Sequence, residues 1–277
     1  MPELPEVETI RRQLHARLQG ATIERVELLR SSRERPLGQA FVRAVTGQMI
    51  TSVDRRAKLL IWRLKSGQAI LAHLKMTGRF LFVDESYAST KHDAIRFLGR
   101  DKKGRQFWLI WNDVRKFGFM EVVTDMELEK KLTEYGPEPL ECSPVVLAER
   151  LQSPKTRLLK AALLDQSCIA GVGNIYADEA CFRAGIHPNR RLGALQTKER
   201  LRLAKEIQAV LTESIAQQGT SAHTYVDTTG SRGGFVALLR VYDREGEPCV
   251  NCKTPIQKLR LVQRGTHVCP SCQTEST

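Results

Sequence analysis

The chain of 277 residues carries 43 lysines and arginines against 31 aspartates and glutamates, which gives a formal net charge of +12 and a pI of about 9.6. This balance favours a polyanionic partner, usually nucleic acid, although charge alone leaves a merely basic soluble protein open. Hydrophobic residues make up 42% of the chain, which excludes a disordered basic tail and provides cores for about two domains. No apolar run approaches the ~20 residues that span a bilayer, and the first residues lack a secretory apolar core, so we expect no membrane partner.

The first segment is predicted to be a helix. Pro5 suits a first turn, and Glu6 and Glu8 complement the positive end of the helix. Gly20 is the expected stop. One apolar face follows the helical period and consists of Val7, Ile10, Leu14 and Leu18.

From residue 21 to residue 124 the pattern changes to that of strands. Candidate strands cover residues 23–28, 59–62, 70–74, 80–83 and 107–111, and residues 101–104 are predicted to form a hairpin turn. A β-sandwich and a β-barrel both fit this pattern. Two prolines and a glycine within residues 135–139 mark a domain boundary, because they continue neither kind of element.

Beyond this boundary the signals are helical. Ser143-Pro144 and Ser153-Pro154 each give an N-cap followed by a proline at the first helical position, and the second pair is predicted to open a helix. Further helices are expected at residues 175–184, ended by Gly185, and at about 197–218. Residues 219–234 are rich in glycine, serine and threonine and are predicted to be a functional or a disordered loop.

Four cysteines near the end of the chain form two C-x-x-C pairs separated by 16 residues: Cys249, Cys252, Cys269 and Cys272. They can supply the four soft ligands of a closed structural Zn²⁺ site, with two disulfides or four unrelated thiols as the alternatives. The three other cysteines are an odd number, as is common in a reducing cytoplasm.

The stretch between the two cysteine pairs has the length of a β-hairpin, with a turn expected at Arg264-Gly265. A small metal-bound hairpin with basic side chains directed away from the body is suited to probing nucleic acid. Its basic residues include Lys258, Arg260, Arg264 and His267.

Four separated segments resemble bacterial formamidopyrimidine-DNA glycosylase in their order and spacing. They are PELPEVET at residues 2–9, DVRKFG at 113–118, GVGNIYADE at 171–179 and RGTH at 264–267. The resemblance covers essentially the whole chain and implies an α+β multidomain protein. The expected parts are an N-terminal helix plus β-sandwich (1–135), a helical helix–two-turn–helix module with a lesion-capping loop (136–235) and a four-cysteine zinc finger holding one zinc ion (236–277).

The resemblance also implies a function in base-excision repair. The expected enzyme is a cytoplasmic, nucleoid-associated monomer that excises 8-oxoguanine and formamidopyrimidines from double-stranded DNA. It also cleaves the strand at abasic sites by β,δ-elimination.

Pro2 is the expected nucleophile. Removal of Met1 would leave a secondary amine that can attack the sugar carbon bearing the damaged base and form an iminium. An α-amino group has a pKa of ~7.7–8.0; the helix end lowers this value, whereas Glu3 and Glu6 raise it, and the sequence leaves the balance open.

Four further side chains complete the expected catalytic set. Glu3 is assigned to proton transfer at the sugar ring oxygen. Glu6 either orients the site or handles water, or is only a favourable first-turn acid. The resemblance assigns Lys58 as a general acid/base or phosphate contact and Arg264 to the second elimination step and to phosphate binding.

Extrusion of a nucleotide from a duplex requires side chains that fill the hole. The resemblance assigns Met76 and Phe117 as wedges and Arg115 as the partner of the orphaned cytosine. Asn174 is expected to hold a phosphate at a helix start, although a turn asparagine is the alternative. Further candidates for DNA contacts are His73, His92, Lys155, Lys160, Tyr242 and Lys258.

The chain departs from the family pattern at three positions. His223 stands where relatives often carry an arginine, Thr77 where some have a glutamate, and Ala94 where a second histidine is usual. These departures put the fine lesion preference and one phosphate contact in doubt.

Two other functions remain open from the sequence. An enzyme similar to endonuclease VIII would act on oxidised pyrimidines, but Leu4, Pro5 and the Met76, Arg115 and Phe117 trio favour the purine enzyme. A non-catalytic zinc-finger protein that binds damaged DNA would have no need of the Pro2-Glu3 start.

Overall fold

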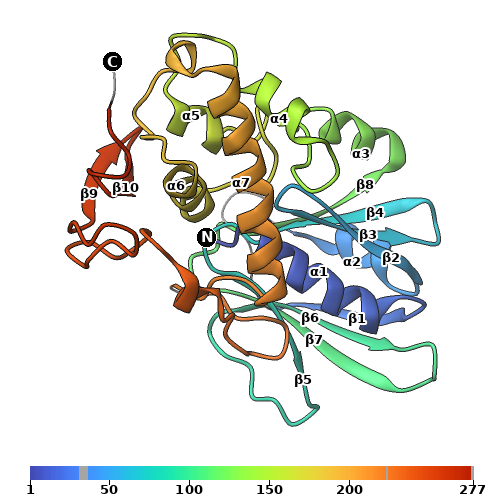
Figure 1. Ribbon diagram of the computed structural model, residues 1–277. Coiled ribbons are helices and arrows are strands. Elements are labelled where there is room, and N and C mark those ends of the chain that lie inside the picture. Colours follow the sequence, from blue (N-terminus) through green and yellow to red (C-terminus); the bar gives the residue numbers. More distant parts are fainter. Residues whose placement is uncertain (31–36, 223, 276–277) are drawn as a thin grey trace. The chain divides into compact units, whose positions relative to one another are not determined.

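The computed structural model describes residues 1–30, 37–222 and 224–275, which form two compact units (Figure 1). One unit combines Met1–Thr133 with Gln218–Gly233, and the other combines Glu134–Gln217 with Gly234–Thr277. The segment 218–233 therefore belongs with the N-terminal residues, although α7 leads into it. Position 223, the histidine departure, lies outside the described residues.

The first unit contains two four-stranded antiparallel sheets with the strand orders β1-β6-β7-β5 and β2-β3-β4-β8. Side chains from both sheets form one core with the apolar face of α1, so the unit is a sandwich, as the resemblance implied. The elements are α1 (Leu4–Leu18), β1 (Thr22–Leu28), α2 (Gln39–Val45), β2 (Ile50–Arg56), β3 (Leu59–Leu64), β4 (Gln68–His73), β5 (Gly78–Val83), β6 (Asp93–Arg100), β7 (Gln106–Asp113), β8 (Phe119–Thr124) and α3 (Asp125–Leu132).

The expected N-terminal helix is confirmed, and all four residues of its predicted apolar face are buried. Gly20 has a φ of +78°, which suits the chain reversal after the helix. The hairpin turn at 101–104 is also confirmed, since the Gly104 N–H donates to the Asp101 carbonyl between β6 and β7. Helices α2 and α3 were not expected; α3 covers the outer face of the second sheet with Leu128.

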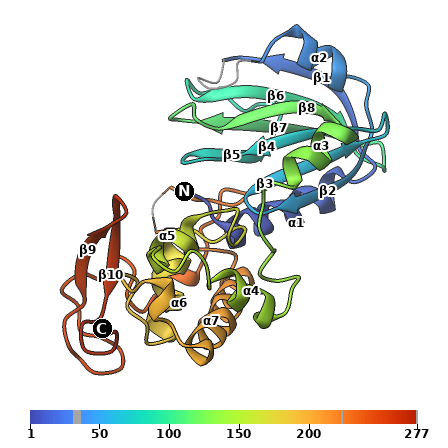
Figure 2. The ribbon, with the colours of Figure 1, turned by 90° about the horizontal axis from the view of Figure 1, so that it is seen from above.

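The second unit contains a group of helices and a two-stranded hairpin (Figure 2). Helix α7 packs against α4 and α6, and α6 also contacts β10. The elements are α4 (Pro144–Arg150), α5 (Leu159–Leu164), α6 (Asn174–Arg183), the 3₁₀ turn η1 (Leu192–Ala194), α7 (Thr197–Ala216), the 3₁₀ turn η2 (Phe235–Leu238), β9 (Gln257–Leu261) and β10 (Arg264–Val268).

Two local predictions for this unit are wrong. Ser153-Pro154 opens no helix: α5 begins at Leu159, whose N–H donates to the Arg190 carbonyl, so neighbouring chain satisfies its first turn. The hairpin turn lies at Val262 and Gln263, both with positive φ, rather than at Arg264-Gly265. No helix among the described residues is both long enough and apolar enough to cross a membrane.

Candidate active site and nucleic-acid interface

The expected catalytic residues of the first unit lie at the start of α1. Pro2 is buried and directly precedes the capping box formed by Glu3 and Glu6, in which the Glu3 N–H donates to Glu6 Oε2 at 2.7 Å. Both carboxyl groups are buried, with 3% and 1% of their residue surface exposed. Buried carboxylates require compensating charge or hydrogen bonds, and this site provides both.

Lys58 supplies the opposite charge. It follows Ala57, whose φ of +54° makes the tight turn between β2 and β3, and its side chain is 5% exposed. Burial lowers the pKa of Lys58, whereas the charges of Glu3 and Glu6 act to raise it. The site thus contains two carboxyl groups and an amine in a desolvated setting, where proton transfer is easily tuned.

Glu6 also holds the root of the segment 218–233. Its Oε1 accepts the Thr220 N–H at 2.7 Å. Gly219 has a φ of +89°, and a Cβ there would lie 3.0 Å from Glu6 Oε1. Burial and the charge of Glu6 raise the pKa of Tyr225. The predicted loop is confirmed among the described residues, and its base is hydrogen-bonded to α1.

The three predicted void-filling residues lie on two loops of this unit, not in strands. Met76 lies in the loop between β4 and β5 and is 39% exposed. Arg115 and Phe117 lie between β7 and β8, and the Arg115 guanidinium lies 5.1 Å from the Phe117 ring centroid. Met76 is an exposed apolar side chain on a loop, whereas Phe117 is half-buried. An exposed apolar side chain at a loop is suited to the wedge role.

Asp113 and Thr77 join these two loops. The Thr77 hydroxyl donates to Asp113 Oδ1 at 2.5 Å and accepts the Arg115 N–H at 3.0 Å. The other Asp113 oxygen accepts the Gly118 N–H at 2.7 Å. A Cβ on Gly118 would lie 2.6 Å from Trp111 Cζ2, so only glycine permits this close approach. We name Thr77 and Asp113, with the N–H groups that they accept, the loop clamp.

Two candidate histidines lie beside the loop clamp. His73 Nδ1 accepts the Lys75 N–H at 2.9 Å, and its ring stacks on Phe119. The His92 carbonyl accepts the Asp113 N–H at 2.9 Å. Ala94, one of the departures, is half-buried in β6 and packs against the sandwich core.

In the second unit, Asn174 is the first residue of α6. Its side-chain Nδ2 donates to the Gly265 carbonyl at 2.8 Å and so ties the helix start to the β9–β10 hairpin. Backbone N–H groups at a helix start are suited to a phosphate. The carbonyl of Asn174 accepts a hydrogen bond from Lys160 Nζ at 3.3 Å.

Lys160 was expected to contact the DNA backbone, but its residue surface is 0% exposed. Its ammonium forms an ion pair with Asp178, which is equally buried. The second Asp178 oxygen accepts the His267 N–H at 2.9 Å. Lys160 therefore acts from within the unit, where it positions α6 and the hairpin rather than meeting a phosphate.

His267 was expected to be presented with the other basic residues of the hairpin, and this prediction is wrong. Its ring is buried against Tyr242, with 5.0 Å between ring centroids. The last three residues of β10, Thr266–Val268, are all buried, and the His267 N–H donates to Asp178, whereas Arg264 at the start of the strand is exposed. Among the remaining candidates, Lys155 and Lys258 are exposed and Tyr242 is half-buried.

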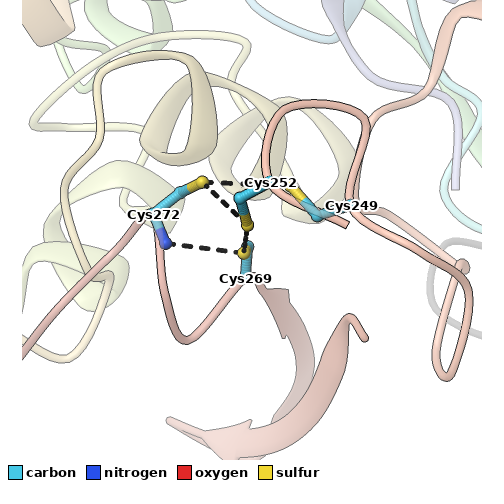
Figure 3. A group of neighbouring side chains, drawn as sticks. All are labelled: Cys249, Cys252, Cys269 and Cys272. Atoms are coloured by element: carbon cyan, nitrogen blue, oxygen red, sulfur yellow. Dashed lines mark hydrogen bonds between the residues drawn. The ribbon is translucent and has the colours of Figure 1, made fainter. Parts of the chain in front are cut away.

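The four predicted cysteines form one cluster (Figure 3). Their sulfur atoms all lie within 4.8 Å of one another, with 3.4 Å between Cys252 and Cys269 and 3.9 Å between Cys249 and Cys272. Zn–S bonds of about 2.3 Å in a tetrahedron require sulfur separations of about 3.8 Å, so the residues fit a single zinc ion. A site with four cysteine ligands leaves no position for substrate and is therefore structural.

Three positioning residues were not expected as site residues: Asp113, Asp178 and Glu179. Glu179 accepts the N–H groups of Arg240, Val241 and Tyr242 and so fixes the chain that enters the hairpin. Asp113 carried a usable signal, because an aspartate at a loop start accepts N–H groups a few residues on. The acidic residues of α6 gave no such signal in the sequence, because their hydrogen-bond partners are distant along the chain.

Sequence models of three domain families match the chain in order. They are the formamidopyrimidine-DNA glycosylase N-terminal domain at residues 1–120, the formamidopyrimidine-DNA glycosylase H2TH domain at 135–226, and the zinc finger found in FPG and IleRS at 246–274. The third match agrees with the cysteine cluster, and the second contains the start of α6.

Curated relatives and solved structures agree with these matches. The formamidopyrimidine-DNA glycosylase of Geobacillus kaustophilus is 44% identical over 99% of this chain and 100% of its own, and that of Listeria innocua is 42% identical over the same shares. Lactococcus lactis Fpg in complex with DNA containing an abasic site has a TM-score of 0.89 at 33% identity. The wild-type enzyme with N7-benzyl-Fapy-dG DNA gives 0.89 at 35%, and both comparisons cover 99% of this chain and 100% of the other. Identity at this level along the whole of both chains shows that this chain belongs to the formamidopyrimidine-DNA glycosylase family.

Proposed function

We propose that this protein is a base-excision repair glycosylase and abasic-site lyase that removes oxidised purines from duplex DNA. The relatives are named formamidopyrimidine-DNA glycosylase, and the similar structures hold abasic-site and Fapy-dG DNA. The observation that carries the proposal furthest is the start of α1, where Pro2 precedes two buried carboxyl groups beside Lys58. A protein that only binds damaged DNA gains nothing from burying this charge cluster.

In the proposed reaction, the Pro2 amine attacks C1′ of the damaged nucleotide after Met1 has been removed. The bond from C1′ to the base breaks, and the base leaves with the electron pair and takes up a proton. Glu3 gives a proton to the ring oxygen O4′ as the sugar opens, and an iminium forms between Pro2 and C1′. Lys58 supplies a positive charge beside the carboxyl groups of Glu3 and Glu6.

Strand scission follows from the iminium. Loss of a proton from C2′ expels the 3′ phosphate, a second elimination expels the 5′ phosphate, and water then releases the sugar fragment from Pro2. Arg264 is assigned to the second elimination, because a guanidinium binds a phosphate leaving group through paired hydrogen bonds. The exposed position of Arg264 at the start of β10 supports this role.

Binding and flipping are assigned to both units. Met76 and Phe117 fill the vacated space and Arg115 pairs with the opposite cytosine, with the loop clamp keeping the two loops in register. Asn174 and the exposed cations Lys155 and Lys258, with His73, His92 and Tyr242, are proposed to contact the backbone. The zinc ion, held by the four cysteines, supplies only rigidity to the hairpin.

We propose that the chain has three functional parts, with boundaries between residues 135 and 136 and between residues 235 and 236. The lesion-capping segment, assigned to the middle part, would then act through its root on Glu6. One flipped nucleotide requires one site, so we propose a monomer. The protein is proposed to act on nucleoid DNA in the cytoplasm, where free thiols such as Cys142 and Cys168 persist.

Borohydride trapping tests this function. Untagged protein with Pro2 as its first residue is mixed with a duplex carrying one 8-oxoguanine opposite cytosine, and a thymine-glycol duplex is run alongside. We expect a covalent adduct at Pro2 on the first duplex. An adduct only on the second would indicate a pyrimidine enzyme, and binding without any adduct would indicate a non-catalytic protein.

A further inference from the structure

A cavity lies in the first unit, at the end of α1 opposite to Pro2. It has a volume of about 400 Å³ and lies between the last turn of α1 and the turn that joins β6 to β7. A Cβ on Gly20 would lie 3.4 Å from the Lys102 Cβ, which shows how closely the two segments approach. The residues that matter are Arg17, Asp101, Lys102, Lys103, Arg105 and Phe107.

Positive charge dominates this cavity, since four cations face a single carboxylate. Asp101 is already engaged: it forms an ion pair with Arg105 at 2.8 Å and accepts the N–H groups of Lys103 and Arg105. Within the part of the chain that the structure describes, no carboxylate pairs with Arg17, Lys102 or Lys103. The cavity therefore has an excess of positive charge that an anion would balance.

Aromatic packing fixes one wall of the cavity, whereas the four cations are exposed. The Arg17 guanidinium lies 3.7 Å from the centroid of the Phe82 ring, and Phe82 meets Phe107 edge to face at 6.0 Å. Phe107 in turn lies over Gly99, where any Cβ would come within 2.4 Å of its ring. Burial and the nearby charge of Arg105 lower the pKa of Arg17, and Asp101 only partly opposes them. The planar guanidinium of a stacked arginine can bind two oxygens of a phosphate through paired hydrogen bonds.

We propose that this cavity, named the α1–β6/β7 cavity, binds a phosphate-bearing anion of mononucleotide size, separately from the excision site. Arginine and lysine are the usual phosphate ligands, and Phe107 offers a surface on which a base can stack. The volume falls within the range of small-ligand pockets, roughly 300–1,000 Å³.

The separation from the excision site follows from the two elements that reach the cavity. Arg17 lies thirteen residues after Leu4 on α1, which corresponds to about 20 Å along a helix. Strand β7 likewise leads from the cavity at Gln106 to the loop clamp at Asp113, about 23 Å away at the rise of a strand. Two sources provide the chemistry: a free nucleotide, or a backbone phosphate of DNA that extends beyond the lesion.

Calorimetric titration of the full chain with ATP at about 0.15 M salt tests the site. The variant K102Q/K103Q removes two cavity charges and keeps the Lys102 β-carbon, which lies near Gly20. The matched control K198Q/K205Q removes two exposed charges from α7. We expect one ATP per chain, an affinity at least tenfold weaker in the cavity variant, and a change below twofold in the control. Equal weakening in both variants overturns the proposal, because it would mean that only net charge matters.

Two further arms distinguish the sources. F107L should weaken ATP but not pyrophosphate if a base stacks in the cavity. Excision from a 15-base-pair duplex should be unchanged in K102Q/K103Q, which separates this site from catalysis. If ATP fails to bind and K102Q/K103Q weakens only a 40-base-pair duplex, the phosphate belongs to DNA and the nucleotide is ruled out. No effect on any ligand removes the site altogether.

Discussion

Glu3 and Glu6 occupy neighbouring positions in one capping box but have different tasks. Glu6 uses one oxygen for the Glu3 N–H and the other for the Thr220 N–H, both at 2.7 Å. Both oxygens of Glu6 are thus held by backbone N–H groups, one at the start of α1 and one in segment 218–233. We therefore expect Glu3 to be the acid for the ring oxygen and Glu6 to be a positioning residue.

Glu3→Gln should preserve lesion binding and abolish base release. An amide keeps the size of the side chain but has no acidic proton, so we expect base release to fall by at least 10²-fold. Single-turnover excision of 8-oxoguanine measures the rate, and Glu141→Gln, an exposed acid of the second unit, is the control. Unchanged turnover would remove Glu3 from the mechanism.

Thr77→Val should slow lesion excision more than abasic-site cleavage. Valine has the shape of threonine but loses the hydroxyl that bridges Asp113 and the Arg115 N–H, at a cost of about 1.5 kcal/mol, or roughly tenfold in rate. An abasic site needs no base extrusion, so its cleavage should change by less than about twofold. Thr77→Ser should restore excision. Equal losses on both substrates would show that the loop clamp serves only stability.

At the scale of elements, α1 is attached to β2 through Glu8. Its carboxylate accepts Arg12 Nε at 2.8 Å, Arg11 Nη2 at 2.9 Å and Arg55 Nε at 3.1 Å. Burial tends to raise the pKa of Glu8, but the hydrogen bonds from Arg11 and Arg12 and the charges outweigh it, so the net pKa is lowered. Helix α1 is thus fixed to the sandwich by charge as well as by apolar packing.

Glu8→Gln should reduce stability near neutral pH by about 1–3 kcal/mol, because the Arg55 charge loses a buried partner. Because the pKa of Glu8 is lower in the folded protein than its unfolded value of about 4.3, its ion pairs stabilise the fold at pH values above about 4.3. This stabilisation is lost as the pH falls through the pKa of the folded state. Urea unfolding at pH 7 and pH 3 measures the free energy. We expect the difference between the variant and the parent to shrink at pH 3, and a pH-independent difference would contradict the charge explanation.

The zinc hairpin is the second element whose role can be isolated. Cys249→Ala should reduce bound zinc from one ion to none and weaken duplex binding at least tenfold, because the hairpin loses its rigid base. Cys142→Ala, a thiol outside the cluster, should keep both. Zinc content by atomic absorption and affinity by fluorescence anisotropy are the measurements. Intact binding after zinc loss would mean that the hairpin makes no important DNA contact.

For the molecule as a whole, the net charge of +12 predicts strong dependence of binding on salt. If four to six phosphates are contacted, the logarithm of the affinity should fall with the logarithm of salt concentration with a slope of about −4 to −5. Anisotropy titrations between about 50 and 200 mM salt give the slope. A slope near zero would place the affinity in base contacts and void filling instead.

Periodic and local patterns in the sequence predicted most of the fold. The apolar face of α1, the 101–104 turn and the start of α4 at Pro144 depend on neighbours within a few residues, so they could be predicted. The short helices α2 and α3 lie within the strand-rich stretch and gave no distinct signal. The resemblance, not periodicity, distinguished sandwich from barrel, because that difference depends on how strands pair across the chain.

The site residues also divide into those that local sequence could predict and those that depend on distant contacts. The four cysteines could be predicted because their spacing encodes their geometry. The burial of Lys160 could not, because its partner Asp178 lies 18 positions away on another helix. A lysine is rarely fully buried unless it is paired, and the pairing is a property of the folded unit.

The two hydrogen bonds of Glu6 connect the start of α1, which carries the proposed nucleophile, to Thr220 at the root of segment 218–233. A displacement of Thr220 would therefore act through Glu6 on the backbone N–H of Glu3, the residue next to Pro2. Glu6 variants should alter proteolytic cleavage within the segment and excision rates together. Loss of activity in a Glu6 variant would then indicate a lost connection between α1 and segment 218–233 rather than a missing proton donor.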